Sequence, residues 1–165
     1  MGLLLLSLGL SLVCAQKFDP RAIVQQNYNM ARVSGVWYLI SMASSDLKRI
    51  EKDGDLRVFI RNIQYLQNGS LMFDFRFVVQ GACEEVVVVC EKTDRNGEFS
   101  ISYEGKNKVT VLETDYWNYI TFYLQNIKNK TETRVLALFE TCKKYKLDSQ
   151  NIIEMSRQDP CYARR

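Results

Sequence analysis

Side chains able to perform covalent chemistry are scarce in this chain of 165 residues. It contains no histidine, which excludes Ser-His-Asp and Cys-His nucleophilic sites, histidine-ligated zinc and any pH switch based on imidazole. Thiol chemistry remains, at Cys14, Cys83, Cys90, Cys142 and Cys161. No two of these cysteines form a CxxC motif or another close metal-ligand spacing. We therefore expect no metal site, no other cofactor and no catalytic residue.

Two catalytic hypotheses, one for a cysteine and one for paired carboxylates, are weak on physical grounds. A nucleophilic cysteine needs a lowered pKa, normally supplied by histidine or a nearby cation. Cys90 has no histidine to serve it. Glu84 and Glu85 are adjacent, so on a strand they point to opposite faces and cannot share a substrate. The sequence favours a protein that is not an enzyme.

The first fifteen residues have the features of a secretory leader. Residues 2–13 read GLLLLSLGLSLV without a charge, and Val13-Cys14-Ala15 presents small residues where a signal peptidase cleaves. The apolar stretch is too short to span a bilayer comfortably, and no later segment is apolar enough to cross a membrane. We expect a signal peptide over residues 1–15 and a secreted domain over residues 16–165.

Secretion changes how the other cysteines and two asparagines are interpreted. Disulfides persist in an oxidising compartment, and the four cysteines that remain after cleavage allow three pairings. Asn68-Gly69-Ser70 and Asn129-Lys130-Thr131 are acceptor sequences for glycosylation. Asn68-Gly69 is also a typical hairpin turn. The formal charge of +3 is modest, which argues against nucleic-acid binding.

The mature sequence is a series of short runs with a period of two, the pattern of half-buried strands. A change of apolar parity after Ile60 predicts a β-bulge near Arg61-Asn62. Val86 to Val89 are apolar on both parities, which predicts a strand covered on both faces. The alternating apolar positions are Leu71, Phe73, Phe75 and Phe77; Phe99, Ile101 and Tyr103; and Ile120, Phe122 and Leu124.

Turn signals separate these runs and favour one all-β architecture. From Trp37 onward we count about eight strands, joined mainly by hairpins. Such a meander either splits into a sandwich or closes, and local connections favour an eight-stranded antiparallel up-and-down β-barrel. Eight strands can enclose one small ligand. The turns are predicted at residues 67–69, 94–97, 104–107 and 126–130.

Three features give a resemblance to a known family: Gly35-Val36-Trp37 at the first strand, Thr114-Asp115-Tyr116 before the seventh, and cysteines at 83 and 161. Together, behind a leader, they resemble the lipocalins over about residues 27–161. The resemblance is greatest to the urinary-protein and odorant-binding branch and, within it, to epididymal secreted lipocalins. It implies an open-mouthed calyx that carries small hydrophobic molecules such as odorants, pheromones, retinoids or fatty acids.

The resemblance also implies which residues face the interior of the barrel and bind the ligand. Tyr103 is the best candidate to offer a hydrogen bond, and four phenylalanines leave room for a small ligand only. The alternative is that the same side chains fill a solid core. The implied ligand-binding residues are Leu56, Val58, Ile60, Ile63, Leu71, Phe73, Phe75, Val88, Ile101, Tyr103, Val109, Phe122, Leu124, Val135 and Phe139.

Structural roles carried over from the family fit this chain only in part. Cys83–Cys161 is the implied disulfide, while Cys90 and Cys142 have three options: to pair, to join two molecules, or to stay buried. Trp37 is expected to close the barrel floor under an arginine after the eighth strand. No arginine follows there, and residues 141–146 leave only a short helical turn of the usual long helix.

The expected function is reversible, noncatalytic transport of a small hydrophobic ligand by a secreted glycoprotein. A cell-surface receptor is a possible partner, and the expected state is a monomer or weak dimer. One alternative is an extracellular interaction protein with a filled barrel that acts through its loops. The other is a lipid isomerase that depends on the thiol of Cys90.

Overall fold

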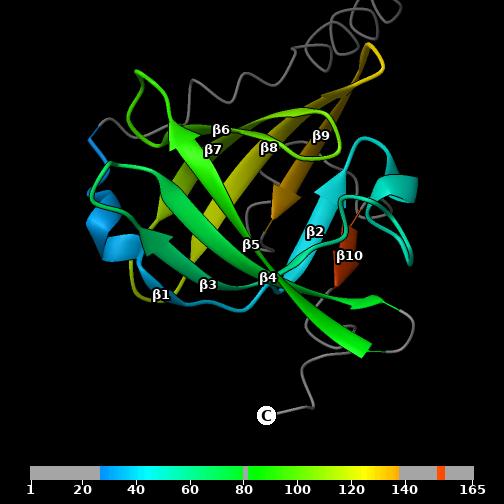
Figure 1. Ribbon diagram of the computed structural model, residues 1–165, viewed down its shortest axis with the longest axis horizontal. Helices are drawn as coiled ribbons and strands as arrows, with labels where there is room; N and C mark the ends of the chain where they lie inside the picture. The colour runs from blue at the N-terminus through cyan, green and yellow to red at the C-terminus, as the bar shows by residue number, and fades with distance from the viewer. Residues whose placement is uncertain (1–26, 80–81, 138–151, 155–165) are drawn as a thin grey trace, which may run out of the picture.

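The structure is a computed structural model that describes residues 27–79, 82–137 and 152–154. Antiparallel strands make up nearly all of it, with two short 3-10 helices near the start, η2 (Met30–Val33) and η3 (Leu47–Arg49). Figure 1 shows the strands curled around a common interior. They are β1 (Gly35–Val36), β2 (Ser41–Ser44), β3 (Phe59–Tyr65), β4 (Leu71–Val79), β5 (Ala82–Lys92), β6 (Glu98–Ser102), β7 (Lys106–Thr114), β8 (Ile120–Lys128), β9 (Thr131–Ala137) and β10 (Ile152–Glu154).

The first predicted strand is split, and its halves lie at opposite edges of the meander. β1 pairs with β3 through Gly35 opposite Ile63, while β2 pairs with β9 through Met42 opposite Ala137. Between these edges, β3 to β9 pair each with the next in sequence. Counting β1 and β2 as one strand gives the expected eight, with β10 added outside β2. The all-β antiparallel up-and-down fold is confirmed.

Local features of the strands follow the sequence closely. Along β4, Leu71, Phe73 and Phe75 are buried while the intervening side chains are partly exposed. The register between β3 and β4 shifts between Ile60 and Asn62, so the predicted bulge is confirmed. Such a bulge bends a strand and increases its twist, which helps a sheet to curl.

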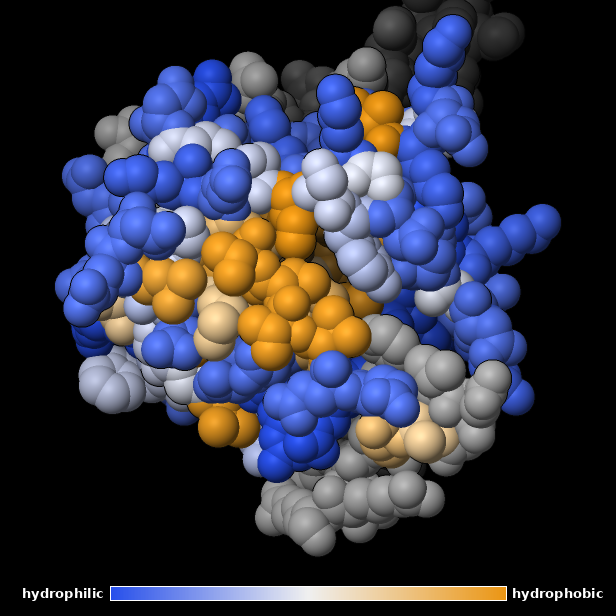
Figure 2. All heavy atoms as spheres, in the orientation of Figure 1, coloured by the Kyte–Doolittle hydropathy of each residue, from blue (hydrophilic) through white to orange (hydrophobic). Residues whose placement is uncertain are grey.

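The prediction that β5 is covered on both faces is wrong. Val86 and Val88 are partly buried toward the interior, but Val87 and Val89 are 54% and 44% exposed. Hydrophobic side chains gather in the middle of the face seen in Figure 2, where β5 crosses in Figure 1. Valine favours a strand whether its side chain is buried or exposed. A run of valines therefore predicts a strand but does not show which of its faces are buried.

Two predicted turns also differ from the structure. β8 continues to Lys128, and the hairpin turns at Asn129 and Lys130, whose φ angles are +50° and +64°. Asn126 therefore lies within the strand, where it is fully buried. The turn predicted at 104–107 is likewise shorter, since it lies at Glu104 and Gly105 and β7 begins at Lys106. The turns at 67–69 and 94–97 lie where predicted; at the β3–β4 turn Gly69 has a φ of +86°.

The two family motifs meet at one end of the barrel, next to η2. The indole of Trp37 donates to the Val33 carbonyl at 2.8 Å and packs against the main core. In the second motif, the Thr114 hydroxyl accepts from the backbone N–H of Tyr116 at 2.9 Å. The guanidinium of Arg32 lies 4.5 Å from the centre of the Tyr116 ring. The family pattern places an arginine after the eighth strand and over Trp37. The arginine at this end of the barrel is instead Arg32 of η2, before the first strand, and it stacks on Tyr116.

Several predictions fall outside the described residues: the leader (1–15), Phe139, the helical turn at 141–146, Cys142 and Cys161. The Cys83–Cys161 bridge and the leader therefore stay predictions. Cys90 is a free, buried cysteine, the third of its three options. Within the described ranges no helix is long and apolar enough to cross a membrane.

Candidate functional site: a cavity inside the barrel

An apolar cavity of about 90 Å³ lies inside the barrel. Its volume is several times the ~10–15 Å³ that one water molecule needs. It is smaller than typical drug-binding pockets, which measure ~300–1,000 Å³. The space is therefore suited to a small molecule. Its described lining consists of Met42, Leu56, Val58, Ile60, Phe73, Phe75, Val88, Cys90, Ile101, Tyr103, Asn107, Val109, Phe122, Leu124, Val135 and Ala137.

Most residues expected on the inner face do lie there. Twelve of the fifteen line the cavity; Ile63 and Leu71 are buried in the adjoining core instead. Ile63 also lines a second, smaller space of about 20 Å³ beside Trp37 and Ile120. The interior is thus partly filled and partly hollow, between the two arrangements considered from sequence.

The sequence did not indicate four lining residues. Met42 and Ala137 face each other across β2 and β9, at the position where the barrel closes. Asn107 was expected in a turn, and Cys90 was considered for a disulfide, for burial or as the thiol of an isomerase, but not among the carrier's lining residues. Cys90 lies an even number of residues from Val88, a signal that could have placed it inside. Nothing local to Asn107 distinguishes a buried amide from a turn residue.

Aromatic rings limit the size and shape of the cavity. Phe73 and Phe122 meet edge to face with ring centres 5.4 Å apart. Phe75 and Tyr103 meet in the same way at 6.0 Å. Such pairs contribute about 0.5–1.5 kcal/mol beyond the burial of their area. Both pairs start from β4, so the rings join that strand to more distant parts of the wall.

The polar groups in the lining are few and uncharged. The Asn107 side chain is fully engaged: its amide nitrogen donates to the Tyr103 carbonyl at 2.6 Å and its oxygen accepts from Asn126 at 2.7 Å. Burial raises the pKa of the Cys90 thiol to about 12. Burial, followed by the charges of Glu104 and Asp55, also raises the pKa of Tyr103. At neutral pH both groups are protonated.

The end of the cavity opposite η2 is covered by a loop over residues 45–58, which we call the mouth loop. Ile50 and Leu56 from this loop are 0% and 2% exposed and pack with Phe59 and Val135 in a second hydrophobic cluster. Gly54 lies so close to the backbone of Arg49 that an added Cβ would be 2.5 Å from its carbonyl carbon. The loop is a folded, close-packed cover.

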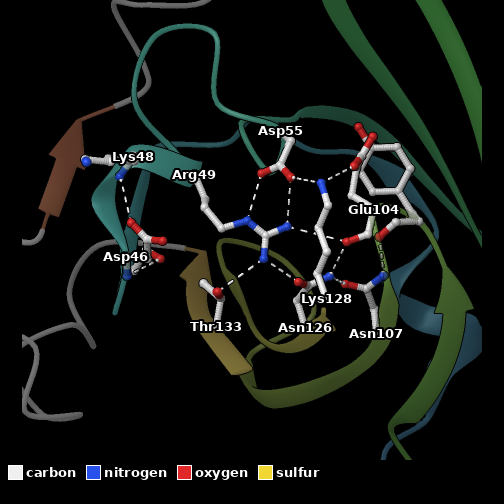
Figure 3. Close-up of polar contacts among 11 residues, drawn as sticks. Asp46, Lys48, Arg49, Asp55, Glu104, Asn107, Asn126, Lys128 and Thr133 are labelled. Carbon is white, nitrogen blue, oxygen red and sulfur yellow. Dashed lines mark hydrogen bonds and ion pairs between the residues drawn. The ribbon is translucent and has the colours of Figure 1, made fainter. Parts of the chain in front are cut away.

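Polar contacts tie the mouth loop to the two hairpins beside it (Figure 3). Arg49 makes two hydrogen bonds to Asp55, at 2.8 and 2.9 Å. Lys128, on the β8–β9 hairpin, donates to Asp55 at 2.8 Å and to Glu104 at 2.6 Å. Arg49 also donates to Asn126, at the end of β8. We call Arg49, Asp55, Glu104 and Lys128 the mouth clamp, because they join three loops around the cavity.

Comparison with known proteins agrees with this geometry. Residues 34–159 match the family model described as the lipocalin / cytosolic fatty-acid binding protein family. This chain is a lipocalin. Members of the family carry small hydrophobic ligands, and they are generally binding proteins and not enzymes.

Individual relatives support the branch that the sequence resembles. "Epididymal-specific lipocalin-9" of Homo sapiens is 66% identical over 99% of this chain and 93% of its own length. "Major urinary protein 4" of Mus musculus is 35% identical over 96% of each chain. The crystal structure of the possum milk whey lipocalin trichosurin at pH 4.6 with bound 4-ethylphenol is 26% identical. It covers 75% of this chain and 96% of its own, with a TM-score of 0.68.

Proposed function

We propose that this lipocalin carries a small hydrophobic molecule in the barrel cavity by reversible, noncatalytic binding. The observation that carries the proposal is the cavity of about 90 Å³ inside the barrel, lined by inward-facing apolar side chains. Burial of a ligand there contributes about 25 cal/mol per Å² of apolar surface. The trichosurin structure, with 4-ethylphenol bound, supports a compact aromatic or aliphatic ligand over a retinoid or long fatty acid.

Two substitutions on the same strand test where the ligand binds. Val88 lines the cavity, while Val87, the next residue, is 54% exposed on the outside. Val88→Trp should fill the cavity and abolish saturable binding of a neutral fluorescent probe such as N-phenyl-1-naphthylamine. Val87→Trp should leave binding unchanged. Equal binding by both variants would place the ligand elsewhere and overturn the proposal.

The free thiol in the cavity does not favour an isomerase. A catalytic cysteine acts as the thiolate, and burial raises the pKa of Cys90 to about 12. None of the described residues that line the cavity with this thiol is a cation that could reverse the effect. Turnover of a lipid substrate that disappears in Cys90→Ala would contradict the noncatalytic assignment.

An exposed aromatic loop favours a second function, recognition of a cell-surface receptor. Trp117 is 76% exposed, and its loop is held by Asp115, which accepts backbone hydrogen bonds from Trp117, Asn118 and Tyr119 at 2.7–3.0 Å. A rigid exposed tryptophan is typical of a binding hot spot. Trp117→Ala should then weaken attachment of the labelled protein to epithelial cells, with probe binding retained. Attachment equal to that of the unaltered protein would reject this role.

We also propose that the leader directs secretion and that Asn68 and Asn129 are glycosylated. Both asparagines are exposed at hairpin turns, and the urinary and epididymal relatives are generally secreted proteins. The mature protein from mammalian cells should begin at Gln16. Treatment with peptide-N-glycosidase F should lower its mass in two steps, one lost in Asn68→Gln and the other in Asn129→Gln.

A further inference from the structure

We propose that β5 binds an extended, positively charged peptide of a partner protein, which adds a strand along its free edge. This edge comprises residues 84–90, and we call it the β5 edge. It lies on the outside of the barrel, so binding there is independent of the carrier function. The strand pairing, the exposed side chains and the charge of the β5 edge support the proposal.

β5 has only one neighbouring strand for most of its length. Residues 82–90 all pair with β4, but only Glu91 and Lys92 pair with β6. No other strand in the described parts of the chain pairs with the β5 edge, and Figure 1 shows β5 running away from the β6–β7 hairpin. Alternate residues of an edge strand direct both backbone groups to the open side, which gives about three or four unpaired N–H and C=O pairs here.

β6 does not cover the β5 edge because its own hairpin holds it. The Asn107 amide donates to the carbonyls of Ile101 and Tyr103, at 3.3 and 2.6 Å. The N–H of Tyr103 donates to the Gly105 carbonyl at 3.0 Å. The chain at the end of β6 is therefore bonded within the β6–β7 hairpin, and the β5 edge stays open to another strand.

The β5 edge lacks the features that usually protect an edge strand from association. Proteins place lysine, proline, a bulge or an inward-pointing charge on such edges. Residues 84–90 read EEVVVVC, without lysine, proline or glycine, and their pairing with β4 continues without a bulge. On the outer face Val87 and Val89 are 54% and 44% exposed. Because valine has a high strand propensity, the β5 edge is suited to pair with a further strand.

The charge on the outer face indicates the chemistry of the partner. The side chains there follow in the order Glu85, Val87, Val89 and Glu91. Glu85 faces Arg76 at 3.5 Å, but its side chain is still 54% exposed. Glu91 makes no ion pair with any described residue. Opposite charges on neighbouring strands stabilise a sheet, so a strand with two apolar side chains between two cations matches this order.

The same charges disfavour a second copy of this chain as the occupant. In an antiparallel pair of β5 edges, a register that sets Val87 of each copy opposite Val89 of the other also sets Glu85 opposite Glu91. Like charges placed opposite one another destabilise a sheet. An acidic peptide is disfavoured for the same reason.

Short fluorescent peptides test the strand addition and its charge preference. The basic peptide, KTVTVTK, presents lysine, valine, valine and lysine on one face of a strand, and the acidic peptide, ETVTVTE, has glutamates at its ends. Each is titrated with the secreted protein at pH 7 and low ionic strength, and anisotropy is measured. We expect the basic peptide to bind about tenfold or more tightly than the acidic one. The chain itself has a formal charge of +3, so net charge does not attract a basic peptide.

N-methylated forms of the basic peptide test whether backbone hydrogen bonds hold it. One form carries N-methyl groups on the valines and the other on the threonines, so each blocks the N–H groups on one edge of the peptide strand. Methylation of the edge that faces β5 should abolish binding, and methylation of the other edge should leave it unchanged.

Substitutions in the protein test where the peptide binds. Val87→Lys adds a cation at the β5 edge and should weaken binding of the basic peptide about tenfold or more. Val36→Lys adds the same charge to a valine that is 61% exposed on β1; it is the matched control and should leave binding unchanged. The double substitution Glu85→Lys and Glu91→Lys should reverse the preference, so that the acidic peptide binds more tightly. Urea unfolding of each variant shows that it is folded.

Several results would overturn the proposal. Equal binding of the basic and acidic peptides would reject the charge preference. Binding that survives both N-methylated forms, or that Val87→Lys leaves unchanged, would reject strand addition at the β5 edge. Absence of peptide binding would reject the basic partner, and a dimer in sedimentation that Val87→Lys abolishes would then identify a second copy as the occupant. None of these results bears on the carrier function, which Val88→Trp tests separately.

Discussion

Replacement of Asp55 by asparagine should measure how strongly the mouth clamp stabilises the protein. Hydrogen bonds from Arg49, and then from Lys128, lower the pKa of the Asp55 carboxyl from 3.8 to about 2. At about 1.4 kcal/mol per pKa unit, the shift corresponds to at most ~2.5 kcal/mol of folding stability. The side chain is 28% exposed, so solvent screening reduces this to about 1 kcal/mol.

The pH dependence of the effect follows from the direction of the shift. Because the folded state lowers the pKa of Asp55, its contribution is complete above the unfolded value of 3.8 and is lost as the pH falls toward about 2. The difference between the unaltered protein and Asp55→Asn should be about 1 kcal/mol at pH 7 and about half of that at pH 3. Urea unfolding followed by tryptophan fluorescence measures it at both values.

A control on another loop makes the result interpretable. Asp94 is exposed in the turn between β5 and β6, and Asp94→Asn should change the free energy of unfolding by less than about 0.5 kcal/mol. If Asp55→Asn is no more destabilising than this control at pH 7, the clamp does not stabilise the loop. A difference that stays constant between pH 7 and pH 3 would equally refute the ionic explanation.

Three further changes test the loop, the thiol and the aromatic wall. Gly54→Ala should lower the free energy of unfolding by about 2 kcal/mol or more, because the new Cβ would lie 2.5 Å from backbone atoms of Arg49; an unchanged thermal midpoint would contradict the packing described. Cys90, 2% exposed with a pKa raised to about 12, should react with an alkylating reagent at pH 8 only after unfolding. Phe73→Ala should cost about 3–5 kcal/mol, since it removes a buried ring and its contact with Phe122. It should also admit larger ligands, as calorimetry with a series of alkylphenols would show.

The alternation of apolar and polar residues predicted the walls of the cavity, because each strand of the wall has one buried face and one solvent-exposed face. Phe73 and Phe75 alternate with Met72 and Asp74, so their side of the sheet could be inferred without the fold. The bulge near Arg61 was visible for the same reason, as a break in that alternation. These features are local, and hydrophobic burial alone determines them.

The parts missed from sequence depend on distant contacts. Met42 enters the lining only because β2 pairs with β9, and nothing within its own strand requires this. Asn107 and Asn126 have the composition of turn residues, yet their amides bond to each other at 2.7 Å inside the barrel. A buried amide is acceptable only where its partners exist, and those partners come from separate hairpins. The mouth clamp joins charges from three loops and has no sequence signature.

The split first strand affects the time course of folding. β1 can pair with β3 as soon as about thirty residues separate them, since Gly35 lies opposite Ile63. β2 must wait for β9, because Met42 lies opposite Ala137, about ninety-five positions later. Contacts so distant in sequence form slowly. During synthesis the chain emerges with its N-terminus first, so β2 stays an unpaired edge, open to association with other chains, until nearly the whole domain has been made.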